Sequence, residues 1–112
     1  MLILLNKPFR VLCQFTDPDG RATLANYVTL PEMYPAGRLD FESEGLMILT
    51  DDGRLQARIS QPKSKIQKTY WVQIEGDASD EQLNTLVSGV ELKDGPAQAI
   101  IAKRMDTPSM LW

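Results

Sequence analysis

The feature that most constrains the fold is an apolar run, Leu46-Met47-Ile48-Leu49, that follows a charged turn and ends before a second turn signal at Asp52-Gly53. A glycine stands on each side of this segment. Four apolar residues in a row between turn signals are typical of a strand buried on both faces. We therefore predict such a strand over residues 46–49, with the preceding turn at the edge of a core.

That turn carries three acidic residues, of which Asp40 is nearest the predicted core. Glu42 and Glu44 lie further into the turn and are expected to face water. A loop carried by rigid, buried elements can hold a reactive side chain in place, so Asp40 is the candidate catalytic group. The plain structural alternative is a surface ion pair with Arg38 or an Asx-type turn contact.

Composition restricts the chemistry that this chain can perform. Its 112 residues, 43% apolar and 24% charged, suit one soluble domain with a modest core. The single cysteine, Cys13, excludes an internal disulfide and is interpreted as a small buried hydrophobe. The absence of histidine excludes histidine-based catalysis and an ordinary zinc or iron site.

No apolar stretch is long enough to cross a bilayer, and residues 1–5 lack the features of a signal peptide, which predicts a cytoplasmic protein.

Charge is unevenly distributed along the chain. The net charge of -3 argues against indiscriminate nucleic-acid binding. Residues 1–68, however, hold nine basic and eight acidic side chains, whereas residues 69–112 hold three basic and seven acidic ones. Arg54 and Arg58 lie four apart on a predicted helix, and Lys63, Lys65 and Lys68 follow closely. These residues form either a phosphate-binding ridge or a solvated face.

The remaining pattern predicts an alternation of short strands and helices. Strands are expected over residues 2–5, 11–15, 68–76, from Val90 to the turn at Asp94-Gly95, and over 97–102. Helices are expected over residues 23–30, from an Asp51 or Asp52 cap to about Ser60, and from a Ser79 cap to Gly89, where Ser79 and Gln82 form a capping box.

The string GRLDFESEGLMILTDDG resembles the catalytic motif of the pseudouridine synthases that modify ribosomal RNA. In that motif Gly-Arg-Leu-Asp is followed by Ser-Glu-Gly, a run of leucines and a Thr-Asn-Asp-Gly type turn. Asn6-Lys7-Pro8 resembles the tripeptide that opens the catalytic domain, and Lys68-Thr69-Tyr70 and Gly89-Val90 continue the resemblance in order. The chain is thus similar to the branch of the small-subunit synthase A, and Gln61-Pro62 is among the segments that look closest to its large-subunit (23S rRNA) synthase E group.

This resemblance implies an α+β fold, a mixed and largely antiparallel sheet flanked by helices, with an active site that uses no cofactor and no metal. It implies isomerisation of a uridine in ribosomal RNA to pseudouridine. Asp40 would be the catalytic carboxylate, and Tyr70 would stack on the base or move a proton near the sugar. The candidate RNA-binding residues are Arg38, Arg54, Arg58, Lys63, Lys65 and Lys68, although Arg38 and Lys68 could instead hold their loops.

One departure from the family pattern affects what is expected of the chain alone. The family carries a downstream Arg-Arg-Met segment whose arginine pairs with the catalytic carboxylate. Lys103-Arg104-Met105 comes too early and lacks the usual lead-in, so we do not assign that role to Arg104. Residues 1–112 are therefore expected to be the N-terminal portion of a catalytic domain, incomplete at its C-terminus and with an exposed sheet edge for self-association or for a complementing fragment.

Two other functions are compatible with the residues. A non-catalytic RNA-binding or scaffold module would keep the fold and its basic residues without turnover. A glycoside hydrolase using Asp40 with Glu42 or Glu44 is disfavoured, because two carboxyl groups from one small turn are poorly placed to flank a sugar.

Overall fold

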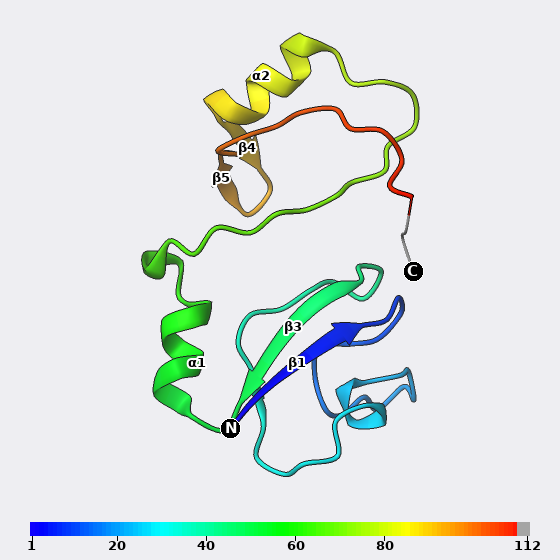
Figure 1. The fold of residues 1–112 in the computed structure, drawn as a ribbon, viewed down its shortest axis with the longest axis vertical. Coiled ribbons are helices and arrows are strands. Elements are labelled where there is room, and N and C mark those ends of the chain that lie inside the picture. Colours follow the sequence, from blue (N-terminus) through cyan, green and yellow to red (C-terminus); the bar gives the residue numbers. More distant parts are fainter. Residues whose placement is uncertain (110–112) are drawn as a thin grey trace. The chain divides into compact units, whose positions relative to one another are not determined.

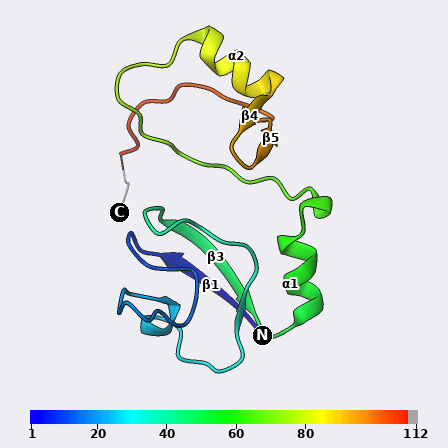
Figure 2. The same ribbon diagram turned by 180° about the vertical axis from the view of Figure 1, so that it is seen from behind.

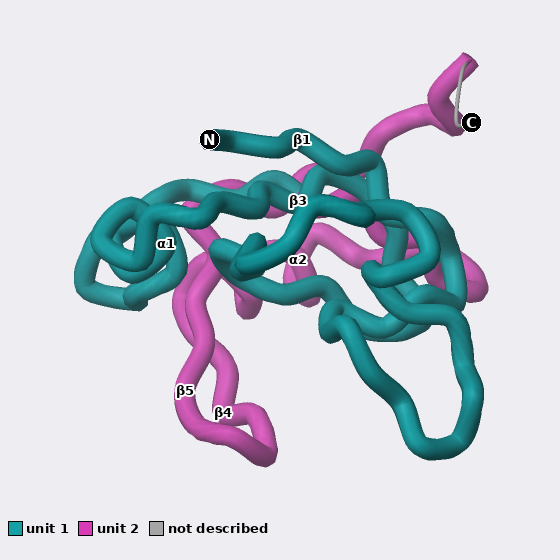
Figure 3. The backbone as a smooth tube through the Cα atoms, turned by 90° about the horizontal axis from the view of Figure 1, so that it is seen from below, with its two compact units in different colours: residues 1–69 teal, residues 70–112 magenta. Residues whose placement is uncertain are grey.

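The computed structural model describes residues 1–109 and contains two compact units (Figure 3). Unit 1 comprises Met1–Thr69, and unit 2 begins at Tyr70. Each unit is described here by itself. None of the helices within the described residues is long and apolar enough to cross a membrane.

Unit 1 is built on a three-stranded antiparallel sheet with the order β1-β3-β2. Figure 1 shows β1 and β3 side by side. β1 (Leu2–Lys7) pairs with β3 (Gly45–Thr50) along its whole length, so that Leu2 faces Thr50 and Lys7 faces Gly45. The short β2 (Tyr34–Pro35) lies on the other side of β3. The predicted strands at 2–5 and 46–49 are confirmed, and β3 is the central strand of the sheet.

The prediction that the strand at 46–49 is buried on both faces is wrong. Met47 and Leu49 are buried, but Leu46 is 63% exposed. Side chains alternate between the faces of a strand, and the core of unit 1 covers one face of this sheet. The buried core consists of Val11, Cys13, Leu24, Val28, Met33, Met47 and Leu49. On β1, Leu2 and Leu4 are likewise exposed, whereas Ile3 and Leu5 pack against the core.

The segment between β1 and β2 is less regular than its sequence predicts. The strand expected at 11–15 is wrong: it is reduced to a single bridge between Leu12 and Thr23, with the Leu12 N–H donating to Ala22 O at 2.9 Å. The helix expected at 23–30 is one 3₁₀ turn, η1 (Leu24–Asn26). Thr23 and Asn26 close a capping box at the start of this turn, and Leu24 is buried. The turn ends at its C-cap residue Tyr27, whose backbone leaves the helical conformation.

The helix after β3 is confirmed. α1 (Gly53–Ser60) is capped by the preceding residue, Asp52, whose side chain accepts hydrogen bonds from the backbone N–H groups of Arg54 and Leu55. Leu55 is partly buried, and Arg54 is exposed on the other side of the helix. α1 leads at Gln61 into the 3₁₀ turn η2 (Pro62–Ser64).

Between residues 70 and 109, unit 2 has one α-helix and one hairpin (Figure 2). α2 (Asp80–Ser88) starts with the predicted capping box between Ser79 and Gln82 and ends at Gly89. β4 (Val90–Leu92) then pairs with β5 (Gly95–Ala97) around the predicted turn. The strand expected at 97–102 is wrong, since β5 ends at Ala97.

The strand predicted at 68–76 is also wrong: among the described residues this segment has no strand partner. Tyr70, Trp71, Val72 and Ile74 are all more than half exposed. An alternating pattern determines where side chains would point, but a strand also needs a neighbouring backbone for its hydrogen bonds. The boundary between the two units falls inside this segment, after Thr69.

Candidate active site

Asp40 lies in the loop between β2 and β3, shortly before the end of β3 that pairs with Lys7. Its side chain is exposed, as are those of Glu42 and Glu44. The preceding residue, Leu39, is partly buried and packs against the core. The prediction of an acidic turn at the edge of the core is therefore confirmed. The Ser43 N–H donates to Asp40 O at 3.1 Å and closes the turn.

The backbone is anchored on both sides of Asp40. The Arg10 N–H donates to Phe41 O at 2.8 Å. On the other side, the Leu39 N–H donates to the Cys13 thiol at 3.2 Å, and that thiol donates to Leu39 O at 3.0 Å. Both neighbours of Asp40 are thus bound to the same short segment, residues 10–13. Arg10 itself adopts a left-handed conformation, with φ of 59°.

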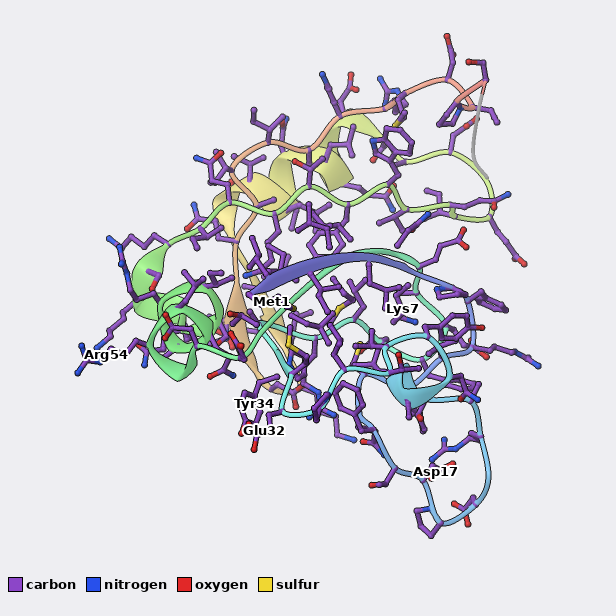
Figure 4. The ribbon with its side chains drawn as sticks, turned by 60° about the horizontal axis from the view of Figure 1, so that its bottom comes forward. Met1, Lys7, Asp17, Glu32, Tyr34 and Arg54 are labelled. Carbon is purple, nitrogen blue, oxygen red and sulfur yellow. The ribbon has the colours of Figure 1, made fainter. Side chains whose placement is uncertain are left out.

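Lys7 stabilises residues 10–13 through hydrogen bonds made in the interior of unit 1. Its side chain is fully buried, and its ammonium group donates hydrogen bonds of 2.9 Å to both Pro8 O and Val11 O. Burial lowers the pKa of Lys7, while the charges of Cys13, Glu44 and Asp40 act in the opposite direction. Figure 4 shows Lys7 at the opposite end of β1 from Met1. Lys7 therefore holds the loop that in turn anchors Asp40.

The Asp40 carboxylate is free of protein partners in the described part of the chain. Within residues 1–109 no ion pair joins Arg38 to Asp40, and no side chain or backbone N–H donates to the Asp40 carboxylate. These contacts therefore do not support the structural alternative, in which Asp40 forms a surface ion pair with Arg38 or an Asx turn. Arg38 is exposed as well. Nearby charges pair elsewhere: Arg10 lies 3.7 Å from Glu42, and Arg21 binds Asp17 at 3.0 Å.

The other basic candidates gather on a different part of unit 1. Arg54 and Arg58 are exposed on α1, Lys63 lies in the adjoining η2, and Lys65 follows it in a left-handed conformation with φ of 52°. Lys68 is exposed further along. α1 starts at the end of β3 that is remote from the Asp40 turn (Figure 1), and Figure 4 shows Arg54 projecting outward. In the part of the chain that is described, none of these five side chains forms an ion pair.

Tyr70 opens unit 2, whereas Asp40 belongs to unit 1. The Tyr70 side chain is 61% exposed. In unit 2, Arg104 is already engaged: it donates to Asp80 at 2.6 Å and to Ala78 O at 2.8 Å. No group of three or more potential ligands that could hold a metal ion occurs among the described residues.

Sequence reasoning missed Lys7 and Cys13 as parts of the site. Both lie on or after β1, far from Asp40 in the chain. Two signals pointed to Lys7: it stands between an apolar strand and a proline, and Asn6-Lys7-Pro8 resembles the tripeptide that opens the catalytic domain. Cys13 was correctly predicted to be buried, at 5% exposure, but its hydrogen bonds to Leu39 had no counterpart in the pattern.

Comparison with known proteins identifies the family. The sequence model of the family described as RNA pseudouridylate synthase matches residues 1–109. A ribosomal large subunit pseudouridine synthase E of Vibrio parahaemolyticus is 52% identical over 111 residues, which cover 99% of this chain and 46% of that protein. The protein of the same name from Xanthomonas campestris is 49% identical over 114 residues, covering 100% of this chain and 61% of the relative.

A solved structure agrees with this assignment. The crystal structure of a pseudouridylate synthase superimposes with a TM-score of 0.76 at 30% identity, over 87% of this chain and 43% of that one. The chain thus spans about half the length of the proteins that it matches. The expected α+β class is confirmed, since unit 1 has antiparallel strands beside helix α1 and unit 2 a helix with a hairpin. From its motif, its fold and these relatives together, we conclude that the chain belongs to the RNA pseudouridylate synthase family.

Proposed function

We propose that this chain carries the catalytic carboxylate, Asp40, of an enzyme that isomerises a specific uridine of ribosomal RNA to pseudouridine. The observation that carries the proposal is the Asp40 carboxylate itself, which is exposed and unpaired although the backbone on both sides of it is anchored. An unpaired acid on an anchored backbone is suited to binding a ligand rather than to stabilising the fold. The relatives are named ribosomal large subunit pseudouridine synthase E, which supports RNA of the large ribosomal subunit as the substrate. We propose 23S rRNA, as the resemblance of the sequence implies.

The reaction requires few protein groups. The bond from C1′ of the ribose to N1 of the uracil breaks, the base turns, and C5 bonds to C1′. The hydrogen on C5 leaves as a proton and N1 gains one, so that the isomerisation balances without redox change or water. One carboxylate beneath the sugar can promote departure of the base and control its return. Attack on the sugar, addition to the base and removal of a sugar proton all remain compatible with one acid at Asp40.

The remaining roles follow from exposure and charge. Tyr70 would stack on the uracil once the nucleotide has left its helix, or transfer a proton near the sugar. Arg54, Arg58, Lys63 and Lys65 would bind RNA phosphates, since their charges are exposed and not neutralised by ion pairs. Arg38, two residues before Asp40 in the sequence, and Lys68 would add contacts near the target nucleotide.

Within its family, we place the chain in the branch of the small-subunit synthase A, with the synthase E group, as a cytoplasmic protein. It would correspond to the N-terminal portion of the catalytic domain, consistent with the share of its relatives that it covers. Leu2, Leu4 and Leu46 form an exposed apolar face on β1 and β3, and β1 is an edge strand. A complementing C-terminal fragment or a second copy would bind there.

Release of tritium from ribosomal RNA labelled at C5 of uridine tests the proposal. The chain and its Asp40→Asn variant are assayed alone and with the C-terminal part of a related synthase. We expect release that depends on Asp40, while the variant binds RNA as tightly as the parent chain. Release by Asp40→Asn at the parent rate would refute the assignment of Asp40.

A non-catalytic RNA-binding module is the second candidate, and one observation favours it. The exposed, unpaired basic side chains of α1 and η2 could bind RNA without any contribution from Asp40. This function predicts RNA binding that is lost when Arg54 and Arg58 are both changed to Gln, together with no tritium release in either form of the assay.

A further inference from the structure

We propose that Cys13 is a positioning residue for Asp40: its thiol holds the peptide groups on the N-terminal side of Asp40 and so fixes the backbone from which the Asp40 side chain projects. This inference rests on the proposed function, in which Asp40 reacts with uridine. It assigns to a buried core residue a part in the reaction that neither the motif nor the relatives indicate.

The contacts of the thiol are specific to one residue. It accepts the Leu39 N–H at 3.2 Å and donates to Leu39 O at 3.0 Å, so that both polar groups of Leu39 bind the same sulfur. Leu39 directly precedes Asp40. Held at both groups, the Leu39 backbone has little freedom to rotate, and rotation there would swing the Asp40 side chain.

The surroundings of the thiol make this anchor hard to replace. Cys13 is 5% exposed and lies in the apolar core, with its sulfur 3.6 Å from that of Met47. Water has little access to take over the hydrogen bonds of Leu39 if the thiol is removed. A side chain at this position must therefore be small enough for the core and still both donate and accept a hydrogen bond.

No other side chain performs this task in the described part of the molecule. On the C-terminal side of Asp40, Phe41 O is held by the backbone N–H of Arg10, at 2.8 Å. Within residues 1–109, Cys13 is the only residue whose side chain binds the backbone of residues 38–42. Substitution of Cys13 consequently releases one of the two anchors of Asp40 and leaves the other intact.

Three variants separate positioning from general stability. Cys13→Ala removes both hydrogen bonds, whereas Cys13→Ser keeps a group that donates and accepts. Val11→Ala is the matched control, because Val11 is 1% exposed in the same core and its side chain makes no hydrogen bond to Leu39. For each variant, hydrogen exchange of the Leu39 amide is compared with hydrogen exchange of the β3 amides. The rate of tritium release is measured in a single turnover, and the dissociation constant for RNA is measured separately.

We expect Cys13→Ala to speed exchange of the Leu39 amide about tenfold more than exchange in β3, as the loss of its hydrogen bonds implies. The rate of tritium release should fall about tenfold with the dissociation constant for RNA unchanged, a change confined to the chemical step. Cys13→Ser should restore both quantities to within about threefold of the parent. Val11→Ala should lower stability without selective loss at Leu39.

The inference is overturned if Cys13→Ala behaves as Val11→Ala does in both measurements, or if Cys13→Ser fails to recover what Cys13→Ala loses. Failure of the proposed function has a different signature: Asp40→Asn would release tritium as fast as the parent, whatever happens at Cys13. Exchange at Leu39 reports on the anchor independently of turnover, so the two failures are distinguished.

Discussion

Replacing Leu49 by Ala tests whether the central strand is covered on one face only. Leu49 is fully buried in β3, in register with Ile3 of β1, and Leu46 lies three residues away on the same strand with 63% of its surface exposed. The two residues have identical side chains and lie on the same strand. They differ in burial, so Leu46→Ala is the matched control.

The expected losses follow from that difference. Leu→Ala at a fully buried site lowers the free energy of unfolding by about 3 kcal/mol, through lost burial and the cavity left behind. At Leu46 most of the side chain already contacts water, so the loss should be about 1 kcal/mol or less. A unit of 69 residues has a stability of roughly 3–10 kcal/mol, so the Leu49 variant should lose a third or more of it.

Urea denaturation followed by circular dichroism measures both variants against the parent chain. We expect a clear shift of the midpoint for Leu49→Ala and a small one for Leu46→Ala, with similar slopes. Equal and large losses at the two positions, at a concentration where the chain is monomeric, would refute the reasoning, because they would mean that the chain itself covers both faces of β3.

Three further predictions concern Lys7, Arg10 and Ser79. Burial lowers the pKa of Lys7 below its ordinary 10.5, so between these two pKa values the unfolded chain binds more protons than the folded chain. The free energy of unfolding, relative to that of a Lys7→Met variant, should therefore rise as the pH increases through that range. Urea midpoints measured from neutral pH upward check this prediction. Arg10→Gly should leave the free energy of unfolding within about 1 kcal/mol of the parent, because glycine accepts φ of 59° and the backbone N–H still donates to Phe41 O. Arg10→Val should lower the free energy of unfolding more, because a β-branched residue is strained at this φ. Thermal unfolding of both variants checks the order. Ser79→Ala should lower the stability of unit 2 by about 1 kcal/mol, because the capping box at the start of α2 is lost. Ser88→Ala, at the other end of α2, should change this stability little. Amide hydrogen exchange of the helix measures both variants.

Local signals in the sequence predicted the parts of the fold that depend on neighbouring residues. The caps at Asp52 and Ser79 defined α1 and α2, because a cap and its partners lie within one turn of helix. The acidic turn around Asp40 was also predicted, because turn residues stood beside an apolar run.

Features that depend on distant contacts could not be predicted in the same way. Whether residues 68–76 form a strand depends on a partner backbone, and residues 11–15 pair only through one bridge. The anchoring of Asp40 by Lys7 and Cys13 joins residues that lie 27 to 33 positions apart in the sequence. Such contacts are set by the packing of the whole unit and have no local pattern.

The two anchors of Asp40 also have an evolutionary consequence. Arg10 binds Phe41 and Cys13 binds Leu39, so the number of residues between the paired positions is constrained in both segments at once. An insertion within 10–13 or within 39–41 would break one pairing or the other. The turn at 17–20, closed by the Gly20 N–H on Asp17 O and bearing exposed residues at its tip, is free of this constraint. Changes in chain length among descendants of this sequence should therefore accumulate at 17–20, while the distance from residue 10 to residue 13 stays invariant.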